Sequence, residues 1–327
     1  MQIGTKGLVT VFGGSGFVGR HVVRALAKRG YRVRVAVRRP DLAGHLQPLG
    51  RVGQIHAVQA NIRNLPSIVR AVQGADAVVN LVGILHESGR QTFDAVQAFG
   101  AGAAARAAKE AGAAHFVQMS AIGASADSDA DYARSKAEGE RRVLEAFPGA
   151  TIIRPSVVFG PEDDFFNRFA AMARISPALP LIGGGNTKFQ VVYVGDVAEV
   201  IARGVDGTLK PGATYEIGGE SVATFKELMQ LMLQEIGRKR LLVPLPFPIA
   251  RMKAGVLQYL PGKLLTPDQV EMLKTDNVVS EAAKKAGLTL EGLGIQPTAM
   301  ENILPEYLWR FRKLGQFQTS PTNTPVQ

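Results

Sequence analysis

Tyr132 and Lys136 have the residue types and the spacing of an acid–base pair. Residues four apart lie on the same face of a helix, so the ammonium group can lie beside the phenol and lower its pKa. A tyrosine held in this way can exchange the proton that accompanies hydride transfer at a carbonyl, and the lysine can also reach a ribose hydroxyl. The pair is common by chance, and its meaning depends on the elements around it.

A glycine-rich stretch near the start of the chain has the spacing that binds a nucleotide pyrophosphate. Residues 8–29, LVTVFGGSGFVGRHVVRALAKR, contain an apolar strand, a turn and a helix. The glycines fit GxxGxxG through Gly13, Gly16 and Gly19, or GxGxxG starting at Gly14. We expect Gly13 to allow a tight turn, Gly16 to let the phosphates approach the backbone, and Gly19 to let the helix lie close to the sheet. The following helix would direct its N–H groups at the anion. An ordinary glycine turn is the alternative.

The end of the second strand favours NADP(H) over NAD(H). A carboxylate that binds the ribose is expected about 20 residues after the glycines, but Arg38 and Arg39 stand there, and Asp41 comes only after Pro40. Two guanidinium groups suit a 2′-phosphate. Residues 1–60 contain ten Lys or Arg and one acidic residue, so most of the net charge of +10 lies here. A solvated strand end is the alternative, and NAD(H) is the alternative cofactor.

Strands and helices alternate through the first half of the chain. After the second strand we expect strands at 54–60, 75–81, 115–120 and 151–154, and helices at 65–72, 92–111 and 131–146. Strands separated by helices imply right-handed crossovers and an α/β fold with a doubly wound parallel sheet. The expected organisation is a Rossmann domain over residues 1–160, a smaller C-terminal lobe over 161–314 interleaved with the sheet, and a disordered tail over 315–327.

Composition narrows the class of protein. The chain has 327 residues and no cysteine, which excludes disulfides and thiolate metal sites. The five histidines are scattered, so we expect no metal. The basic residues form no stripe interleaved with aromatic residues, so we expect no nucleic-acid partner. No apolar run has the roughly 20 residues that a spanning helix needs, and no secretory signal precedes the first strand, which indicates an intracellular protein.

A later segment is both basic and apolar. From Arg238 to Lys263 there are six basic residues and no acidic residue, around the apolar sequence LLVPLPFPIA. Pro244, Pro246 and Pro248 exclude a long helix through the first part. The pattern suits an interfacial segment that contacts an anionic membrane surface or an apolar partner. A lid over the substrate side of a cleft is the alternative.

These stretches resemble the extended short-chain dehydrogenase/reductase superfamily, from residue 8 to about residue 279. The chain is most similar to the atypical branch containing the nucleotide-binding alpha-subcomplex subunit 9 of respiratory complex I. The resemblance is carried by VFGGSGFVGRHVV, VRVAVRRP, QANIRN, VVNLVGIL, YARSKAEGE, IIRPSVVFGPEDDFFNRF and FQVVYVGDVAEVI. It implies a Rossmann domain with a small C-terminal lobe, and cofactor contacts by Gly13, Gly14, Ser15, Gly16, Phe17, Val18, Gly19, Arg38, Arg39, Asn61, Ile62, Val82, Gly83, Ser120, Tyr132, Lys136, Pro155 and Ser156.

The resemblance implies a catalytic role for Tyr132, Lys136 and Ser120, or a vestigial one. Enzymes of the superfamily place a Ser or Thr after the fifth strand, and the register puts either Ser120 or Ala121 there. Gln97 stands where active relatives often have Asn. In the complex I subunit the nucleotide is understood to be a structural element. The leading hypothesis is therefore an NADP(H)-binding accessory subunit of complex I without turnover, peripheral on the cytoplasmic side of the inner membrane, or on the matrix side in an organelle. The alternative is a soluble NADP-dependent reductase or epimerase/dehydratase.

Overall fold

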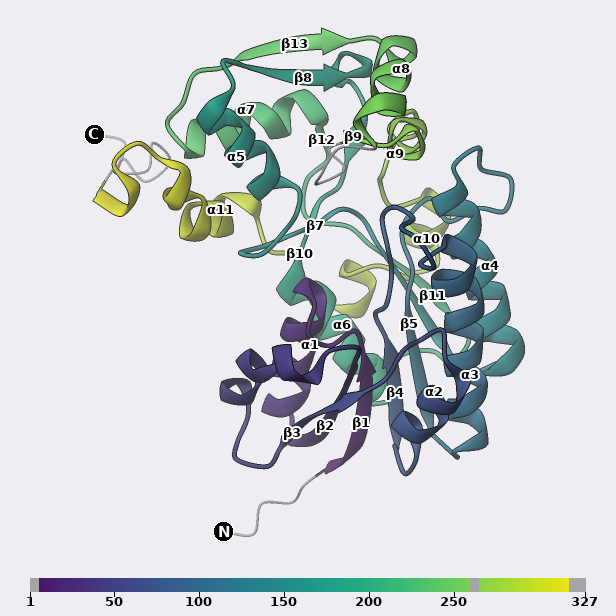
Figure 1. Ribbon diagram of the computed structural model, residues 1–327. Coiled ribbons are helices and arrows are strands. Elements are labelled where there is room, and N and C mark those ends of the chain that lie inside the picture. The colour runs from purple at the N-terminus through teal and green to yellow at the C-terminus, as the bar shows by residue number, and fades with distance from the viewer. Residues whose placement is uncertain (1–5, 259–264, 318–327) are drawn as a thin grey trace. The chain divides into compact units, whose positions relative to one another are not determined.

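The computed structural model describes residues 6–258 and 265–317, which form two compact units (Figure 1). The first unit contains residues 6–155 and two later segments, Gly195–Ile217 and Ala282–Thr289. The second unit contains the rest of the described chain. The chain therefore leaves the first unit after Pro155 and returns to it twice.

The expected division into a Rossmann domain over residues 1–160 and a smaller lobe over residues 161–314 remains a prediction. Gly315–Phe317 form a short 3₁₀ turn at the start of the expected disordered tail, and residues 318–327 of that tail lie outside the described residues. Residues 259–263 of the basic and apolar segment lie outside them as well.

A seven-stranded sheet forms the centre of the first unit, and its neighbouring strands are all parallel. The strand order is β11-β6-β5-β4-β1-β2-β3. The strands are β1 (Lys6–Phe12), β2 (Tyr31–Val37), β3 (Ile55–Gln59), β4 (Ala77–Asn80), β5 (His115–Met119), β6 (Thr151–Pro155) and β11 (Thr214–Ile217). The order reverses between β1 and β4, which is the place where open sheets of this type bind ligands. The predicted doubly wound parallel sheet is confirmed.

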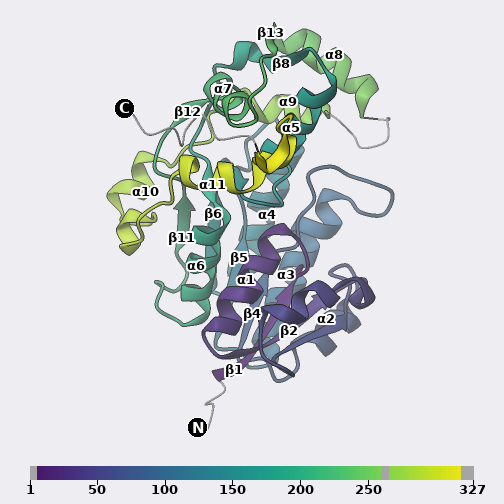
Figure 2. The ribbon, with the colours of Figure 1, turned by 90° about the vertical axis from the view of Figure 1, so that its left-hand side faces the viewer.

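Helices cover both faces of this sheet (Figures 1 and 2). One face carries α1 (Phe17–Lys28) and α6 (Val194–Val205), and the other carries α2 (Leu65–Val72), α3 (Gly100–Glu110) and α4 (Asp131–Ala146). The short helix α10 (Glu281–Lys285) begins the last segment, in which the Leu288 carbonyl accepts a hydrogen bond from the Glu216 N–H on β11. On the α2–α4 face, Ile68, Phe116 and Ile152 are almost fully buried in one core, so burial of apolar surface holds these helices to the sheet.

The single helix predicted over residues 92–111 is wrong in its first half. Asp94–Phe99 form a π-helical turn, and regular α-helix begins only at Gly100. A Cβ on Gly139 of α4 would lie 2.2 Å from the Gln97 carbonyl oxygen, so α4 approaches this turn more closely than any other residue type would allow. Isolated π-turns are often found at functional sites.

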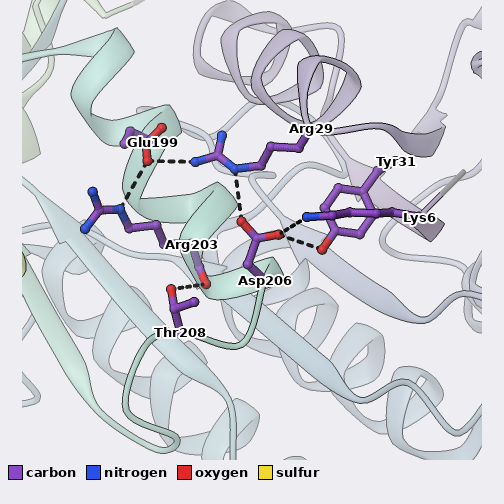
Figure 3. Close-up of polar contacts among 7 residues, drawn as sticks. All are labelled: Lys6, Arg29, Tyr31, Glu199, Arg203, Asp206 and Thr208. Atoms are coloured by element: carbon purple, nitrogen blue, oxygen red, sulfur yellow. Dashed lines mark hydrogen bonds and ion pairs between the residues drawn. The ribbon is translucent and has the colours of Figure 1, made fainter. Parts of the chain in front are cut away.

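A charged cluster joins the end of α6 to the first two strands (Figure 3). Asp206 accepts hydrogen bonds from Lys6 Nζ at 3.2 Å, Arg29 Nε at 3.0 Å and the Tyr31 hydroxyl at 2.7 Å. Arg29 also donates to Glu199 at 2.7 Å. Burial, together with the Asp206 carboxylate, raises the pKa of Tyr31 to about 12. Burial alone would raise the pKa of Asp206, but the hydrogen bonds from Tyr31 and Lys6 outweigh it and hold that pKa below its usual value.

The second unit is built from short strand pairs and helices. Its elements are β7 (Val158–Phe159), α5 (Phe166–Ile175), β8 (Ala178–Ile182), β9 (Lys188–Phe189), β10 (Val192–Tyr193), β12 (Ala223–Thr224), α7 (Phe225–Glu235), β13 (Leu241–Leu245), α8 (Phe247–Leu257), α9 (Pro267–Met272) and α11 (Met300–Leu308). Aromatic rings fill much of its core, where Phe165 contacts Phe166, Phe169, Phe189 and Phe225. This unit therefore has a hydrophobic core of its own.

Candidate nucleotide site and an exposed apolar surface

The glycine turn after β1 has the geometry that its sequence predicts. Gly13 has φ +77°, which L side chains rarely adopt. A Cβ on Gly19 would lie 2.3 Å from the Gly13 carbonyl oxygen and 2.6 Å from the Gly14 backbone, so the close approach of α1 to the turn requires glycine. A Cβ on Gly16 would meet only the Gly13 oxygen, at 3.4 Å, and the residue is exposed. Gly16 therefore leaves open space beside the backbone.

The N-terminus of α1 has the character of an anion site. Gly16 is its N-cap, and no side chain caps the helix. Ser15, Phe17 and Val18 beside it are half-buried. The first N–H groups of a helix need an acceptor, and the helix dipole favours a negative one. A dinucleotide pyrophosphate fits this turn in both charge and space.

The two arginines after β2 are exposed but have different partners. Arg38 donates from Nη1 to Gln91 Oε1 at 2.6 Å. Arg39 instead forms an ion pair with Asp41, in which Nε donates to Oδ1 at 3.1 Å and Nη2 donates to Oδ2 at 2.8 Å. The hydrogen bonds that Arg39 donates to the Asp41 carboxylate raise the pKa of Arg39 and lower the pKa of Asp41. Asp41 thus partly neutralises one of the two expected phosphate ligands.

Asn61 and Ile62, expected near the adenine, shape the loop after β3. The Asn61 Oδ1 accepts the Arg63 N–H at 3.1 Å, and the Asn61 carbonyl accepts the Ser67 hydroxyl at 3.0 Å. Ile62 is buried, and a Cβ on Gly100 would lie 2.8 Å from its Cγ1. Both residues therefore hold the loop against α2 and α3.

Gly83, Gln97 and Lys136 meet in the first unit beyond β4. A Cβ on Gly83 would lie 3.2 Å from Lys136 Nζ and 3.4 Å from Gln97 Oε1, and a Cβ on Gly13 would lie 3.3 Å from Val82. Lys136 is buried, and this burial lowers its pKa to about 8. The structure thus brings Val82 and Gly83 next to the glycine turn on one side and Lys136 on the other.

Tyr132 and Lys136 lie on the same side of α4, as their spacing predicts. Lys136 Nζ lies 5.6 Å from the centre of the Tyr132 ring, and that ring forms a T-shaped contact with Phe93, with centroids 6.0 Å apart. The lysine thus lies over the face of the ring, a cation–π arrangement. Tyr132 is half-buried.

Within the described part of the chain, the buried polar atoms of this unit that lack a hydrogen-bond partner include Ser120 Oγ and Gln97 Oε1. Ser120 follows β5 directly, and its backbone N–H donates to the Ile153 carbonyl at 2.7 Å. Gln97 donates from Nε2 to Ser135 Oγ at 3.0 Å, which turns its Oε1 toward Gly83 and Lys136. Buried polar atoms are nearly always satisfied, so these two point to a polar ligand. This observation fits the nicotinamide half of a dinucleotide.

Pro155 and Ser156 stand at the boundary of the two units. The Pro155 carbonyl accepts the Ile122 N–H at 3.0 Å within the first unit. Ser156 belongs to the second unit, where its hydroxyl donates to Asn277 Oδ1 at 2.6 Å. Ser156 therefore has a structural partner in its own unit, and its expected cofactor contact remains a prediction.

The sequence does not point to Gln91 as a site residue. Gln97 stands out in it only because active relatives often have Asn at that position. Gln91 lies in the turn 88–91, where Ser88 and Gln91 exchange two backbone hydrogen bonds of 3.0 Å. No periodicity marks such a turn. The signal that could have found it is its place in the loop that follows the fourth strand of a Rossmann unit, where loops reach the ligand.

The second unit exposes apolar side chains on β13 and α8. At about 100° per residue, Ile249, Met252 and Val256 of α8 lie within roughly 60° of one another. Met252 is 70% exposed and Val256 69%, whereas Ala250 and Ala254 on the inner face are fully buried. The exposed residues Arg251 and Lys253 lie beyond this stripe on its two sides, and on β13 Leu241 and Val243 are exposed as well. We call the set Leu241, Val243, Ile249, Arg251, Met252, Lys253 and Val256 the β13–α8 surface.

Two further properties concern residues 6–258 and 265–317. No helix there combines the length and apolar character needed to cross a bilayer. No group of three or more His, Asp or Glu side chains in the same residues is placed to hold a metal ion.

Residues 9–218 match the NAD dependent epimerase/dehydratase family. The chain is 37% identical to the mitochondrial NADH dehydrogenase [ubiquinone] 1 alpha subcomplex subunit 9 of Arabidopsis thaliana over 320 residues, covering 94% of this chain and 79% of that one. It is 31% identical to the ceramide reductase of Caulobacter vibrioides over 296 residues, covering 88% and 91%. The crystal structure of dTDP-glucose 4,6-dehydratase from Streptomyces venezuelae with NAD bound superposes with a TM-score of 0.69 at 21% identity, covering 93% and 96%. This last likeness shows the fold.

Proposed function

The chain belongs to the NAD dependent epimerase/dehydratase family, and on that premise we propose that it is an accessory subunit of respiratory complex I that holds NADP(H) as a structural ligand. The observation that carries the assignment is its similarity, over 94% of its length, to a protein named as an alpha subcomplex subunit 9. Its alignment with that subunit extends over both units.

The first unit supplies the residues that would hold the cofactor, apart from Ser156, which belongs to the second unit. The backbone of Gly13, Gly14, Ser15, Gly16, Phe17, Val18 and Gly19 would hold the pyrophosphate, Arg38 and Arg39 the 2′-phosphate, Asn61 and Ile62 the adenine, and Val82, Gly83, Ser120, Tyr132, Lys136, Pro155 and Ser156 the nicotinamide half. The uncapped helix α1 and the two buried polar atoms support this assignment. The bound nicotinamide ring would supply a hydride only in a protein that turns over.

Two features support structural binding without turnover. Ser120 Oγ has no hydrogen-bond partner among the described residues, so it is not coupled to the Tyr132 hydroxyl. Gln97 donates from Nε2 to Ser135 Oγ, so one of its amide N–H groups is not available to a substrate. In this proposal Tyr132 and Lys136 anchor the cofactor, and a ligand that binds only the folded state stabilises it by mass action.

The role is tested with Gly16→Val and Tyr132→Phe in membranes of the native host. Gly16→Val fills the space beside the pyrophosphate, so we expect cofactor content, protein level and assembled complex I to fall together. Tyr132→Phe should lower the stability of the cofactor-bound protein by only about 1 kcal/mol if a hydrogen bond is lost. Assembly of complex I should therefore persist in this variant. If Tyr132→Phe abolishes function while cofactor content and protein level are normal, the structural role is wrong.

The cofactor preference is tested by titrating NADP⁺ and NAD⁺ against the wild type and Arg38→Glu. Each charge-assisted hydrogen bond contributes about 1.5–3 kcal/mol. Reversing the charge at Arg38 should therefore weaken NADP⁺ binding by roughly 10- to 100-fold. The affinity for NAD⁺, which has no 2′-phosphate, should stay nearly unchanged. Equal wild-type affinities for both cofactors would refute the preference.

For its location, we propose a peripheral position on the cytoplasmic side of the inner membrane, or the matrix side in an organelle. The β13–α8 surface supports contact with anionic lipid, because exposed apolar side chains flanked by basic ones suit the headgroup boundary. Flotation with vesicles of anionic lipid should recover the protein, and vesicles of zwitterionic lipid should recover less. Met252→Asp should abolish recovery, whereas the exposed Val222→Asp serves as a matched control.

A soluble NADP-dependent reductase or epimerase/dehydratase is the second candidate. It is favoured by the position of Lys136 over the Tyr132 ring and by the lowered pKa of that lysine. The similarity to a ceramide reductase supports the same reading. In that case Tyr132→Phe should lower turnover by about 10²- to 10⁴-fold. Carbonyl-dependent NADPH oxidation by the free protein would establish this candidate.

A further inference from the structure

The two arginines expected at the 2′-phosphate do not present the same chemistry. Arg39 uses Nε and Nη2, the edge of the guanidinium that matches an oxyanion, to bind both oxygens of Asp41. Arg38 uses Nη1 to bind Gln91 Oε1. A guanidinium has five N–H donors in a fixed fork, so Arg38 keeps its Nε–Nη2 edge for a bidentate contact with phosphate.

The partners also differ in charge. Asp41 carries a negative charge that compensates Arg39 and would repel a phosphate dianion. The Gln91 amide is neutral, so it fixes one arm of Arg38 without reducing the charge of the guanidinium. Arg38 is therefore the stronger phosphate ligand of the two.

Gln91 is itself held in place by the protein. The turn 88–91 is closed by two backbone hydrogen bonds between Ser88 and Gln91. Arg63 Nη1 donates to the Arg90 carbonyl at 2.7 Å, and Glu87 Oε1 accepts the Phe93 N–H at 2.7 Å. The turn is thus fastened to the loop after β3 and to the start of the π-turn, so the position of Gln91 does not depend on a bound ligand.

We propose that Gln91 positions Arg38 for the 2′-phosphate, so that the turn 88–91 is a second determinant of cofactor choice. This inference rests on the proposed binding of NADP(H). Holding the guanidinium before binding reduces the side-chain entropy that is lost when the phosphate arrives. Gln91 acts through Arg38 and is a positioning residue.

The test is calorimetric titration of the full chain with NADP⁺ and with NAD⁺. Gln91→Ala should weaken NADP⁺ binding by roughly 2- to 10-fold, the range for one neutral hydrogen bond. Gln91→Glu should weaken it by roughly 10- to 100-fold, because the new carboxylate would compensate Arg38 as Asp41 compensates Arg39. NAD⁺ affinity should not change in either variant, which also shows that the site is folded. Arg39→Ala should cost less NADP⁺ affinity than Arg38→Ala.

The exposed Gln230→Ala on α7 is the matched control and should bind both cofactors as the wild type does. If the wild type prefers NADP⁺ but Gln91→Ala keeps its full affinity, the role of Gln91 is wrong and the proposed cofactor stands. If the wild type shows no preference, the proposed cofactor is wrong and the inference fails with it. An equal loss of NADP⁺ and NAD⁺ affinity in Gln91→Ala would show that the turn only supports the fold.

Discussion

Removing the charge of Asp206 should lower both the stability of the protein and the sensitivity of that stability to acid. The carboxylate accepts hydrogen bonds from Lys6, Arg29 and Tyr31. The Lys6 side chain is 52% exposed, so that pair contributes little, whereas the Arg29 and Asp206 side chains are 22% and 20% exposed. Asp206→Asn keeps the shape and one acceptor, so we expect a loss of about 1–3 kcal/mol at neutral pH, or roughly 2–12 °C in Tm.

The sign of the pH dependence follows from the lowered pKa of Asp206. A depressed carboxyl pKa contributes stability above the pKa of the unfolded chain, and that contribution is lost as the pH falls through the folded value. The difference between wild type and variant should therefore be constant at neutral pH and shrink below about pH 4.

Urea unfolding followed by circular dichroism across this range measures both effects. Glu145→Gln, which removes an exposed ion pair with Arg141 on α4, is the matched control and should cost about 0.5 kcal/mol or less. If Asp206→Asn costs no more than the control, or if its acid dependence equals that of the wild type, the cluster does not fasten α6 to the sheet.

Two further predictions concern the nucleotide site. Gly19→Ala should destabilise the protein by about 1–3 kcal/mol, because the new Cβ would lie 2.3 Å from the Gly13 carbonyl oxygen. Gly16→Ala, whose Cβ has its nearest contact at 3.4 Å, should leave the stability unchanged and weaken cofactor binding. Thermal unfolding and cofactor titration of both variants distinguish the two roles, and equal stability of the two variants would contradict the predicted clash at Gly19. Because burial lowers the pKa of Lys136 to about 8, affinity for the anionic cofactor should fall as the pH rises through that value. Lys136→Met should show weaker binding without this dependence, and an unchanged pH profile in that variant would assign the effect to another group.

The fold of the first unit could be predicted because its signals are local and periodic. Helices α2 and α4 begin and end at the expected residues 65, 72, 131 and 146. The π-turn at Asp94–Phe99 could not be predicted, because residues 94–99 have the sequence of an ordinary helix. The π-turn goes together with the close packing of Gly139 against the Gln97 carbonyl oxygen. Local sequence does not contain that contact.

The candidate site was predictable in its backbone parts and less so in its side-chain pairs. The spacing of the glycines gives the turn and the start of α1 directly. The bond between Arg38 and Gln91 joins residues 53 positions apart, and the ion pair of Arg39 with Asp41 depends on how the chain bends at Pro40. In the second unit, β13 contains Pro244, and proline is disfavoured in a strand that has neighbours on both sides. Among the described residues this strand pairs only with β8, so proline is tolerated because the other edge of the strand needs no N–H donor.

The return of the chain to the first unit has a consequence for synthesis on the ribosome. Strand β6 is complete at Pro155, but β11, which pairs with it, ends at Ile217, and the Leu288 carbonyl that binds β11 is translated still later. Until then, the nascent sheet has a bare edge at β6, and such edges template the pairing of other chains. A truncated polypeptide ending near residue 155 should therefore aggregate, even though it carries the whole glycine turn. Translation must therefore pass the first segment of the second unit, Ser156–Val194, before β11 can pair with β6 and cover this edge.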